Sequence, residues 1–300
     1  MPSAELRTAG LVLALAALAP LPAQAQYRGE LAVDAVVLPV TVRDDKGRVV
    51  DKVSSEKFHL WVDGIAVPIR DISRESDLPL ALGFILDTSG SMAGHKLDAC
   101  RQLIGAFLAE RRSDDQVALW TFSDERVLER FPFGMAWYLL PRILEEIRPW
   151  STTALYDMVQ RVPEVMEKAT HPRRAAILLT DGVDNASRLD AEQVTRIAHD
   201  LTTPVYALGV EPPPRPEAEA GPSYEEVLRL IADNSGGRYR RVPSTSEMPE
   251  VVKVLLHELS SRFIVSFTTS GIGVRKWRSL RVEVDGYTAT TRTGYVGTLP

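Results

Sequence analysis

Residues 78–91 read LPLALGFILDTSGS, and this stretch decides the fold. Its first nine residues carry no charge, which is typical of a strand buried on both faces of a parallel sheet. A carboxylate and two hydroxyls then follow at alternate positions, on Asp87, Ser89 and Ser91. Oxygen ligands of this kind suit a hard cation such as Mg²⁺. The stretch therefore predicts a buried strand that ends in a metal-binding loop. Since Ser and Asp are also ordinary helix N-caps, a capped helix start is the alternative for this loop taken alone.

Strands and helices alternate from residue 78 to about residue 262. Apolar runs predict strands at 79–86, 116–122, 174–180 and 203–210, and weaker ones near 126–131 and 237–241. Helical periodicity covers about 95–110, 139–148, 154–169, 190–201, 223–234 and 246–262. This alternation predicts an α/β fold with a doubly wound, mostly parallel sheet that is covered by helices on both faces.

A second carboxylate stands in the same position relative to a strand as the first. Asp181 follows the apolar run 175–180, as Asp87 follows 78–86. Ligands of open parallel sheets bind at the carboxyl ends of the strands. We therefore expect Asp87 and Asp181 to lie at one edge of the sheet, where both can serve one cation.

The order, spacing and context of these residues resemble the metal-ion-dependent adhesion site of von Willebrand factor A domains, the module also found as the integrin inserted domain. The resemblance covers roughly Leu78 to Phe263. It implies a ligand set of Asp87, Ser89, Ser91, Thr153 and Asp181.

The threonine of this set departs from the family pattern. The family usually places glycine before its threonine, whereas Ser151 and Thr152 precede Thr153 here. Alignment on residues 154–157 favours Thr153 as the ligand, with Thr152 as the alternative. The missing glycine indicates a stiffer loop, or one held further from the metal.

Two carboxylates and three hydroxyls leave at least one coordination position of a cation open. In the family, an Asp or Glu of a protein partner fills this position. The resemblance thus implies a non-enzymatic adhesion or protein-binding module whose cofactor is Mg²⁺, or else Mn²⁺ or Ca²⁺. A metal-free structural scaffold is the alternative.

An enzyme that uses Asp87 is a further reading. Phosphatases of the haloacid-dehalogenase type place an Asp nucleophile after the first strand and use Mg²⁺, but they need a second Asp two residues later as the acid. Ser89 stands at that position. The sequence therefore predicts a protein that is not an enzyme, against an Mg²⁺-dependent hydrolase as the alternative.

The N-terminus predicts export. Arg7 precedes an apolar stretch at residues 9–18, and Ala23-Gln24-Ala25 fits a cleavage site, so we expect a signal peptide at 1–25 and a mature start at Gln26. No later apolar run is long enough for a membrane span. We expect a periplasmic or extracellular protein without an integral membrane segment.

The bulk composition is that of a globular protein. The 300 residues are 45% hydrophobic and 25% charged, and the net charge of −5 gives no electrostatic footprint for nucleic acid. Cys100, the only cysteine, lies at helical spacing among apolar residues. It is expected to be a small buried hydrophobe without a disulfide partner.

Both terminal segments, 26–77 and 263–300, read as strands separated by turns. Each is too short to bury a two-sided sheet alone. We expect the two segments to pair into one small β-sandwich into which the α/β domain, 78–262, is inserted. This arrangement is similar to bacterial exported proteins described as von Willebrand factor A-related. Because helix 246–262 leads straight into the strand at Phe263, a shift of that helix on partner binding is a further hypothesis.

Overall fold

A computed structural model describes residues 35–74, 78–214, 216, 221–242, 248–268 and 276–297. Residues Val33–Pro300 form one compact unit. The predicted signal peptide at 1–25 and the mature start at Gln26 lie outside the described residues. Within the described ranges, no helix is both long and apolar enough to cross a bilayer.

A six-stranded sheet forms the centre of the α/β domain, in the order β10-β9-β8-β5-β6-β7. Its strands are β5 (Leu80–Asp87), β6 (Gln116–Ser123), β7 (Arg126–Phe131), β8 (Arg173–Thr180), β9 (Val205–Gly209) and β10 (Arg238–Arg241). All neighbours are parallel except β6 and β7, which are antiparallel. Every residue of β5 is buried, as its uninterrupted apolar sequence predicts for a strand covered on both faces.

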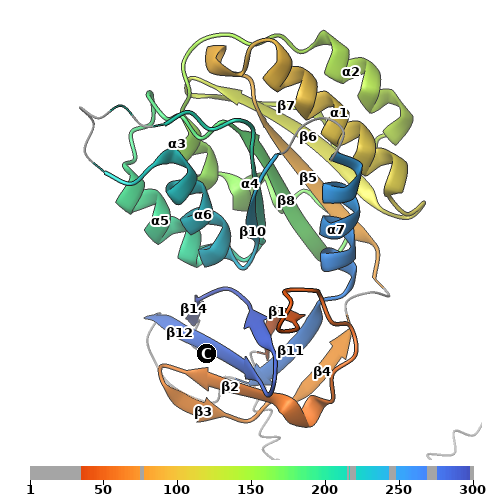
Figure 1. Cartoon of the computed structure of the whole chain (residues 1–300), viewed down its shortest axis with the longest axis vertical. Coiled ribbons are helices and arrows are strands. Elements are labelled where there is room, and N and C mark those ends of the chain that lie inside the picture. Colours follow the sequence, from red (N-terminus) through yellow and green to blue (C-terminus); the bar gives the residue numbers. More distant parts are fainter. Residues whose placement is uncertain are drawn as a thin grey trace, which may run out of the picture. The chain divides into compact units, whose positions relative to one another are not determined.

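Helices cover both faces of this sheet (Figure 1). One face carries α1 (His95–Glu110), α2 (Leu140–Glu146) and α7 (Met248–Ser260). The other carries α3 (Leu155–Gln160), α4 (Val162–Met166), α5 (Ala191–Asp200) and α6 (Tyr224–Ser235). The predicted doubly wound, mostly parallel α/β fold is thus confirmed.

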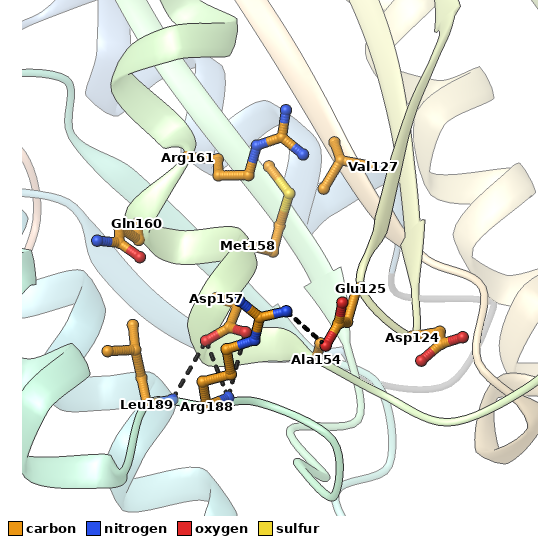
Figure 2. Close-up of a pocket in the computed structure, with 10 residues that line it drawn as sticks. All are labelled: Asp124, Glu125, Val127, Ala154, Asp157, Met158, Gln160, Arg161, Arg188 and Leu189. Carbon is orange, nitrogen blue, oxygen red and sulfur yellow. Dashed lines mark hydrogen bonds and ion pairs between the residues drawn. The ribbon is translucent and has the colours of Figure 1, made fainter.

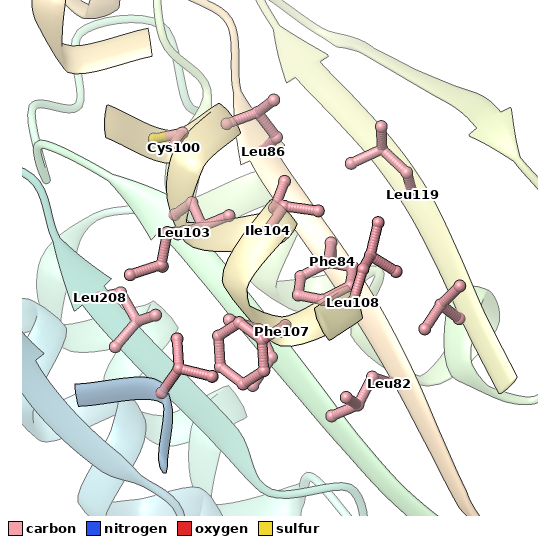
Figure 3. Close-up of a cluster of buried hydrophobic side chains, with 14 of the residues drawn as sticks. Leu82, Phe84, Leu86, Cys100, Leu103, Ile104, Phe107, Leu108, Leu119 and Leu208 are labelled. Atoms are coloured by element: carbon pink, nitrogen blue, oxygen red, sulfur yellow. The ribbon is translucent and has the colours of Figure 1, made fainter. Parts of the chain in front are cut away.

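The core between α1 and the sheet is closely packed (Figure 3). The rings of Phe84 on β5 and Phe107 on α1 meet edge to face, with 5.5 Å between their centroids. Cys100 lies in the same cluster and is 1% exposed, and this burial raises the pKa of its thiol. The cysteine is therefore the buried small hydrophobe that its helical spacing predicts.

The helix expected over 154–169 is in fact two short helices. α3 ends at Gln160, and α4 begins at Val162 after Arg161. Pro163 lies in the first turn of α4, where backbone N–H groups have no partner within the helix, so its missing N–H costs nothing. In the middle of a continuous helix, the same proline would remove a backbone hydrogen bond. The chain therefore restarts the helix at the proline.

The terminal strands form two four-stranded sheets among the described residues, in the orders β13-β1-β11-β4 and β14-β12-β2-β3. The strands are β1 (Ala35–Arg43), β2 (Phe58–Val62), β3 (Ile65–Val67), β4 (Asp71–Arg74), β11 (Phe263–Thr268), β12 (Lys276–Val284), β13 (Thr288–Thr290) and β14 (Gly294–Gly297). β1 pairs with β11, and β2 pairs with β12. Side chains of both sheets share one core, so this is the β-sandwich expected from the two ends of the chain.

A buried ion pair joins this sandwich to α7. Arg43 Nη2, at the end of β1, lies 2.6 Å from Glu258 Oε2 on α7, and the two side chains are 8% and 3% exposed. In the part of the chain that the structure describes, no donor has hydrogen-bond geometry toward Oε2, so its contact with Arg43 is an ion pair. Tyr206 of β9 donates its hydroxyl to the other oxygen, Oε1, at 3.4 Å.

Candidate functional site

The candidate site lies where the central strands β5 and β8 end. These strands are parallel neighbours, and Asp87 is the last residue of β5 while Asp181 directly follows β8. Both residues are 0% exposed. The fold thus buries two carboxylates at the carboxyl edge of the sheet, where ligands of this sheet type bind.

The carboxylate of Asp87 is held by two donors. Its Oδ1 accepts the Ser89 backbone N–H at 2.9 Å, and its Oδ2 accepts the Thr180 hydroxyl at 2.6 Å. Burial raises the pKa of Asp87 to about 6, and the negative charge of Asp181 adds a smaller increase. The hydrogen bonds act in the opposite direction and lower this pKa. Its side chain is therefore fixed in place before any ligand binds.

The two serines turn their hydroxyls toward each other. Ser89 precedes the 3₁₀ turn η3 (Gly90–Met92), and the Oγ atoms of Ser89 and Ser91 lie 3.1 Å apart. Ser89 is 1% exposed, while Ser91 is exposed to solvent. The pair offers two neutral oxygens between the buried carboxylate and the surface.

Backbone hydrogen bonds tie the loop with Thr153 to this first loop. The Gly90 N–H donates to Ser151 O at 2.9 Å, and the Trp150 N–H donates to Thr88 O at 2.8 Å. Thr153 is 1% exposed, whereas Thr152 is exposed. Of the two threonines left open by the sequence, Thr153 is the one buried within the loop cluster.

A third loop, after β8, closes on Thr153. Asn185 Oδ1 accepts the Thr153 N–H at 2.8 Å, and the Asn185 N–H donates back to Thr153 O at 3.1 Å. Asp184 accepts the Leu155 N–H at 2.8 Å through Oδ1, and burial raises the pKa of this carboxyl. Asp184 and Asn185 thus join the loop after β8 to the Thr153 loop.

Ser151 occupies the left-handed region of backbone space, with φ of 63°. A side chain costs about 1–2 kcal/mol in this region, whereas glycine enters it freely. The loop therefore adopts a glycine-like conformation even though the sequence places serine there.

Ser151→Gly is expected to stabilise the protein by about 0.5–1 kcal/mol, because the relief of strain exceeds the extra chain entropy of the unfolded state. Urea denaturation measures the difference. Thr152→Gly is the matched control, since Thr152 has no positive φ and should lose stability. Equal losses in both variants would contradict the strain at Ser151.

A lysine also enters the cluster, and the sequence analysis missed it. Lys96 Nζ, from the first turn of α1, lies 2.8 Å from Asp181 Oδ2, and the two side chains are 15% and 0% exposed. The other oxygen, Asp181 Oδ1, accepts the Val183 N–H at 3.2 Å. A lysine in the first turn of a helix opposes the helix dipole, and this was the signal that could have revealed it.

A pocket lined by both charged and apolar side chains adjoins the Thr153 loop (Figure 2). Arg188 Nη2 donates to Glu125 Oε1 at 2.9 Å, and Asp157 accepts the N–H groups of Arg188 and Leu189, each at 3.2 Å. Arg161, also in its lining, pairs with Glu164 at 3.1 Å. The contacts of Arg188 and Asp157 thus hold neighbouring loops together, whereas Arg161 pairs with a residue of α4 three positions away.

The donors of the site are of mixed type. Across the described ranges, no three His, Cys, Asp or Glu side chains gather as a metal cluster. The loop cluster brings together two carboxylates, serine and threonine hydroxyls and one ammonium. Donors of this kind suit an oxygen-liganded cation better than the nitrogen and sulfur ligands typical of zinc.

Comparison with known proteins agrees with the fold. The sequence-family model for the von Willebrand factor type A domain matches residues 82–254. Proximal thread matrix protein 1 from the mussel byssus aligns with a TM-score of 0.50 and 16% identity, over 66% of this chain and 51% of that one. No curated protein matches the sequence.

Two bacterial structures give similar alignments. An aerotolerance-related membrane protein from Bacteroides fragilis has a TM-score of 0.49 and 19% identity, over 60% of this chain and 98% of that one. A von Willebrand factor type A protein from Catenulispora acidiphila has a TM-score of 0.48 and 12% identity, over 88% of this chain and 72% of that one.

Proposed function

The chain belongs to the von Willebrand factor type A domain family, and from this premise we propose that it is an exported, divalent-metal-dependent protein-binding module. Its metal would be held by the five residues predicted from the sequence, Asp87, Ser89, Ser91, Thr153 and Asp181. The bound ion, Mg²⁺ or else Mn²⁺ or Ca²⁺, would supply an open coordination position for a carboxylate of a protein partner.

One observation carries the proposal: two fully buried carboxylates, Asp87 and Asp181, lie at the ends of adjacent strands, and a cation already contacts one of them. The Lys96 ammonium contacts the fully buried carboxylate of Asp181 at 2.8 Å. Buried carboxylates need a neutralising charge, and two of them lie here at adjacent strand ends. The donor chemistry and the electrostatics thus fit a divalent ion.

The chain's own residues would perform distinct tasks. Thr180 and the Ser89 N–H hold the carboxylate of Asp87 in position. Ser91 is exposed at the surface end of the cluster, where a partner can approach. Asn185 ties the Thr153 loop to the loop that follows β8. A partner's Asp or Glu would be bound through its charge, most strongly where contact with the protein excludes water.

The metal-free scaffold is the second candidate function. The same contact of Lys96 with Asp181 favours it, because an ammonium can serve as a permanent counter-charge. On this view the domain would bind partners, or simply support neighbouring segments, without any ion. Chelation would then change neither stability nor binding.

A catalytic role is not part of the proposal. Ser89, with its hydroxyl toward Ser91, stands where a phosphatase of the kind considered above would need its acid. Export is proposed on the sequence of residues 1–25. Whether that takes the protein to a periplasm or outside the cell, the partner is expected to be another exported or surface protein.

Calorimetric titration of residues 26–300 with Mg²⁺, Mn²⁺ and Ca²⁺ tests the proposal. We expect saturable binding of one ion per chain for at least one of the three, accompanied by a rise in thermal stability, since an ion that binds only the folded state stabilises it. Absence of saturable binding at millimolar concentrations of all three would favour the metal-free scaffold.

A further inference from the structure

Lys96 is an unusual residue for a metal site, because it brings a positive charge to the place where the metal would bind. We propose, on the basis of the metal-binding function above, that Lys96 is a displaceable internal cation. It neutralises Asp181 in the metal-free protein and leaves when a divalent ion binds. Metal affinity is then set by competition with a residue of the chain itself.

The position of Lys96 in α1 supports this role. The helix begins at His95 after Gly94, which has φ of 74° and provides no side-chain cap. The N-terminus of a helix carries partial positive charge, so a lysine in its first turn is unfavourable by itself. The contact with Asp181 offsets this cost, so the lysine is stabilised at this position by the carboxylate.

A divalent ion that binds Asp181 would compete directly with Lys96 for this carboxylate. Its Oδ1 accepts the Val183 N–H at 3.2 Å and its Oδ2 accepts Lys96 Nζ at 2.8 Å, so both oxygens have donors. A divalent ion held by Asp181 would stand close to the ammonium inside a buried cluster. Like charges repel strongly where water is excluded, so the ion and the ammonium cannot share the carboxylate.

The ammonium of Lys96 can also move out into solvent. Its side chain is 15% exposed, while that of Asp181 is fully buried, so the lysine reaches the carboxylate from the solvent side. A flexible four-carbon stem and a strongly hydrated ammonium let lysine exchange a buried partner for water. The neighbouring His95 contacts Glu211 at 2.9 Å on the surface, so the first turn of α1 has a contact that does not involve Lys96.

The test is calorimetric titration of the wild-type protein and of Lys96→Met with Mg²⁺. The methionine keeps most of the stem and removes the charge. We expect the variant to bind Mg²⁺ at least about tenfold more tightly than the wild type. Lys253→Met, which removes an exposed ammonium from α7, is the control for net charge and should bind like the wild type.

A second readout follows the lysine itself. Acetylation of surface amines, measured by mass spectrometry, should reach Lys96 slowly in the metal-free wild type and faster with saturating Mg²⁺, while Lys253 reacts equally in both. Without metal, Lys96→Met should melt at a lower temperature than the wild type, because Asp181 loses its counter-charge. Saturating Mg²⁺ should remove this difference.

The other outcomes separate the inference from the proposed function. Equal affinities of wild type and Lys96→Met, with unchanged acetylation, would overturn the displacement by metal and leave the metal-binding function standing. Binding by Lys96→Met alone would show that the lysine holds the site permanently, which overturns displacement. Absence of binding in both proteins would overturn the inference together with the proposed function.

Discussion

Asp87→Asn is expected to lower the affinity for the proposed divalent ion at least about 100-fold, while the protein stays folded. The substitution removes one of the two negative charges of the cluster. Loss of even an outer partner of a metal ligand typically costs 10–100-fold, and Asp87 is proposed as a ligand itself. Calorimetric titration of wild type and variant side by side measures the change.

The fold should tolerate this change because the amide keeps the hydrogen bonds. Its Oδ1 can still accept the Ser89 N–H, and its Nδ2 can donate to the Thr180 hydroxyl, which now serves as the acceptor. Asp98→Asn is the matched control, since it removes an exposed carboxylate of α1 that pairs with Arg101. An Asp87→Asn variant that binds metal like the Asp98→Asn control would remove Asp87 from the ligand set.

The sequence could predict which residues lie at the carboxyl edge of the sheet, because two simple rules apply there. Buried parallel strands are continuous apolar runs, and the residues that end neighbouring strands meet at one edge. Asp87 and Asp181 meet for this reason, since β5 and β8 are paired in parallel. The burial of Thr153 agrees with the position that the family resemblance gives it.

The sequence could not predict which groups hold these side chains. The bonds from Thr180 to Asp87 and from Asn185 to Thr153 join residues that are 93 and 32 positions apart. Such contacts depend on the path of each loop and on the rotation of each helix about its axis. Lys96 is the clearest case, because its partner follows another strand 85 positions away. Only the tertiary fold brings them together.

The second large effect is expected at the buried ion pair of Arg43 and Glu258. Glu258→Gln should destabilise the protein by about 3–5 kcal/mol, because it leaves the buried guanidinium of Arg43 without its counter-charge. Arg240 adds to the expected destabilisation. Burial is the main cause that lowers the pKa of Arg240, and the negative charge of Glu258 opposes this lowering by favouring the charged guanidinium. Urea denaturation of wild type and variant measures the loss.

Two controls define what this loss means. Glu283→Gln, in an exposed pair with Arg281, should cost less than about 1 kcal/mol. The double variant Arg43→Met/Glu258→Leu should recover most of the stability lost by Glu258→Gln, because apolar side chains of similar volume need no partner. A loss at Glu258 no larger than that at Glu283 would contradict the buried pair.

The same pair bears on how a signal could leave the proposed metal site. α7 ends at Ser260 and β11 begins at Phe263, so the helix carrying Glu258 runs directly into the sandwich. A shift of α7 on partner binding, as the family resemblance suggests, would have to move Glu258 away from Arg43. Its cost would be of the same order as the loss measured for Glu258→Gln. A large loss therefore predicts that α7 stays docked when a partner binds, and that hydrogen exchange of residues 248–268 is the same with and without the partner.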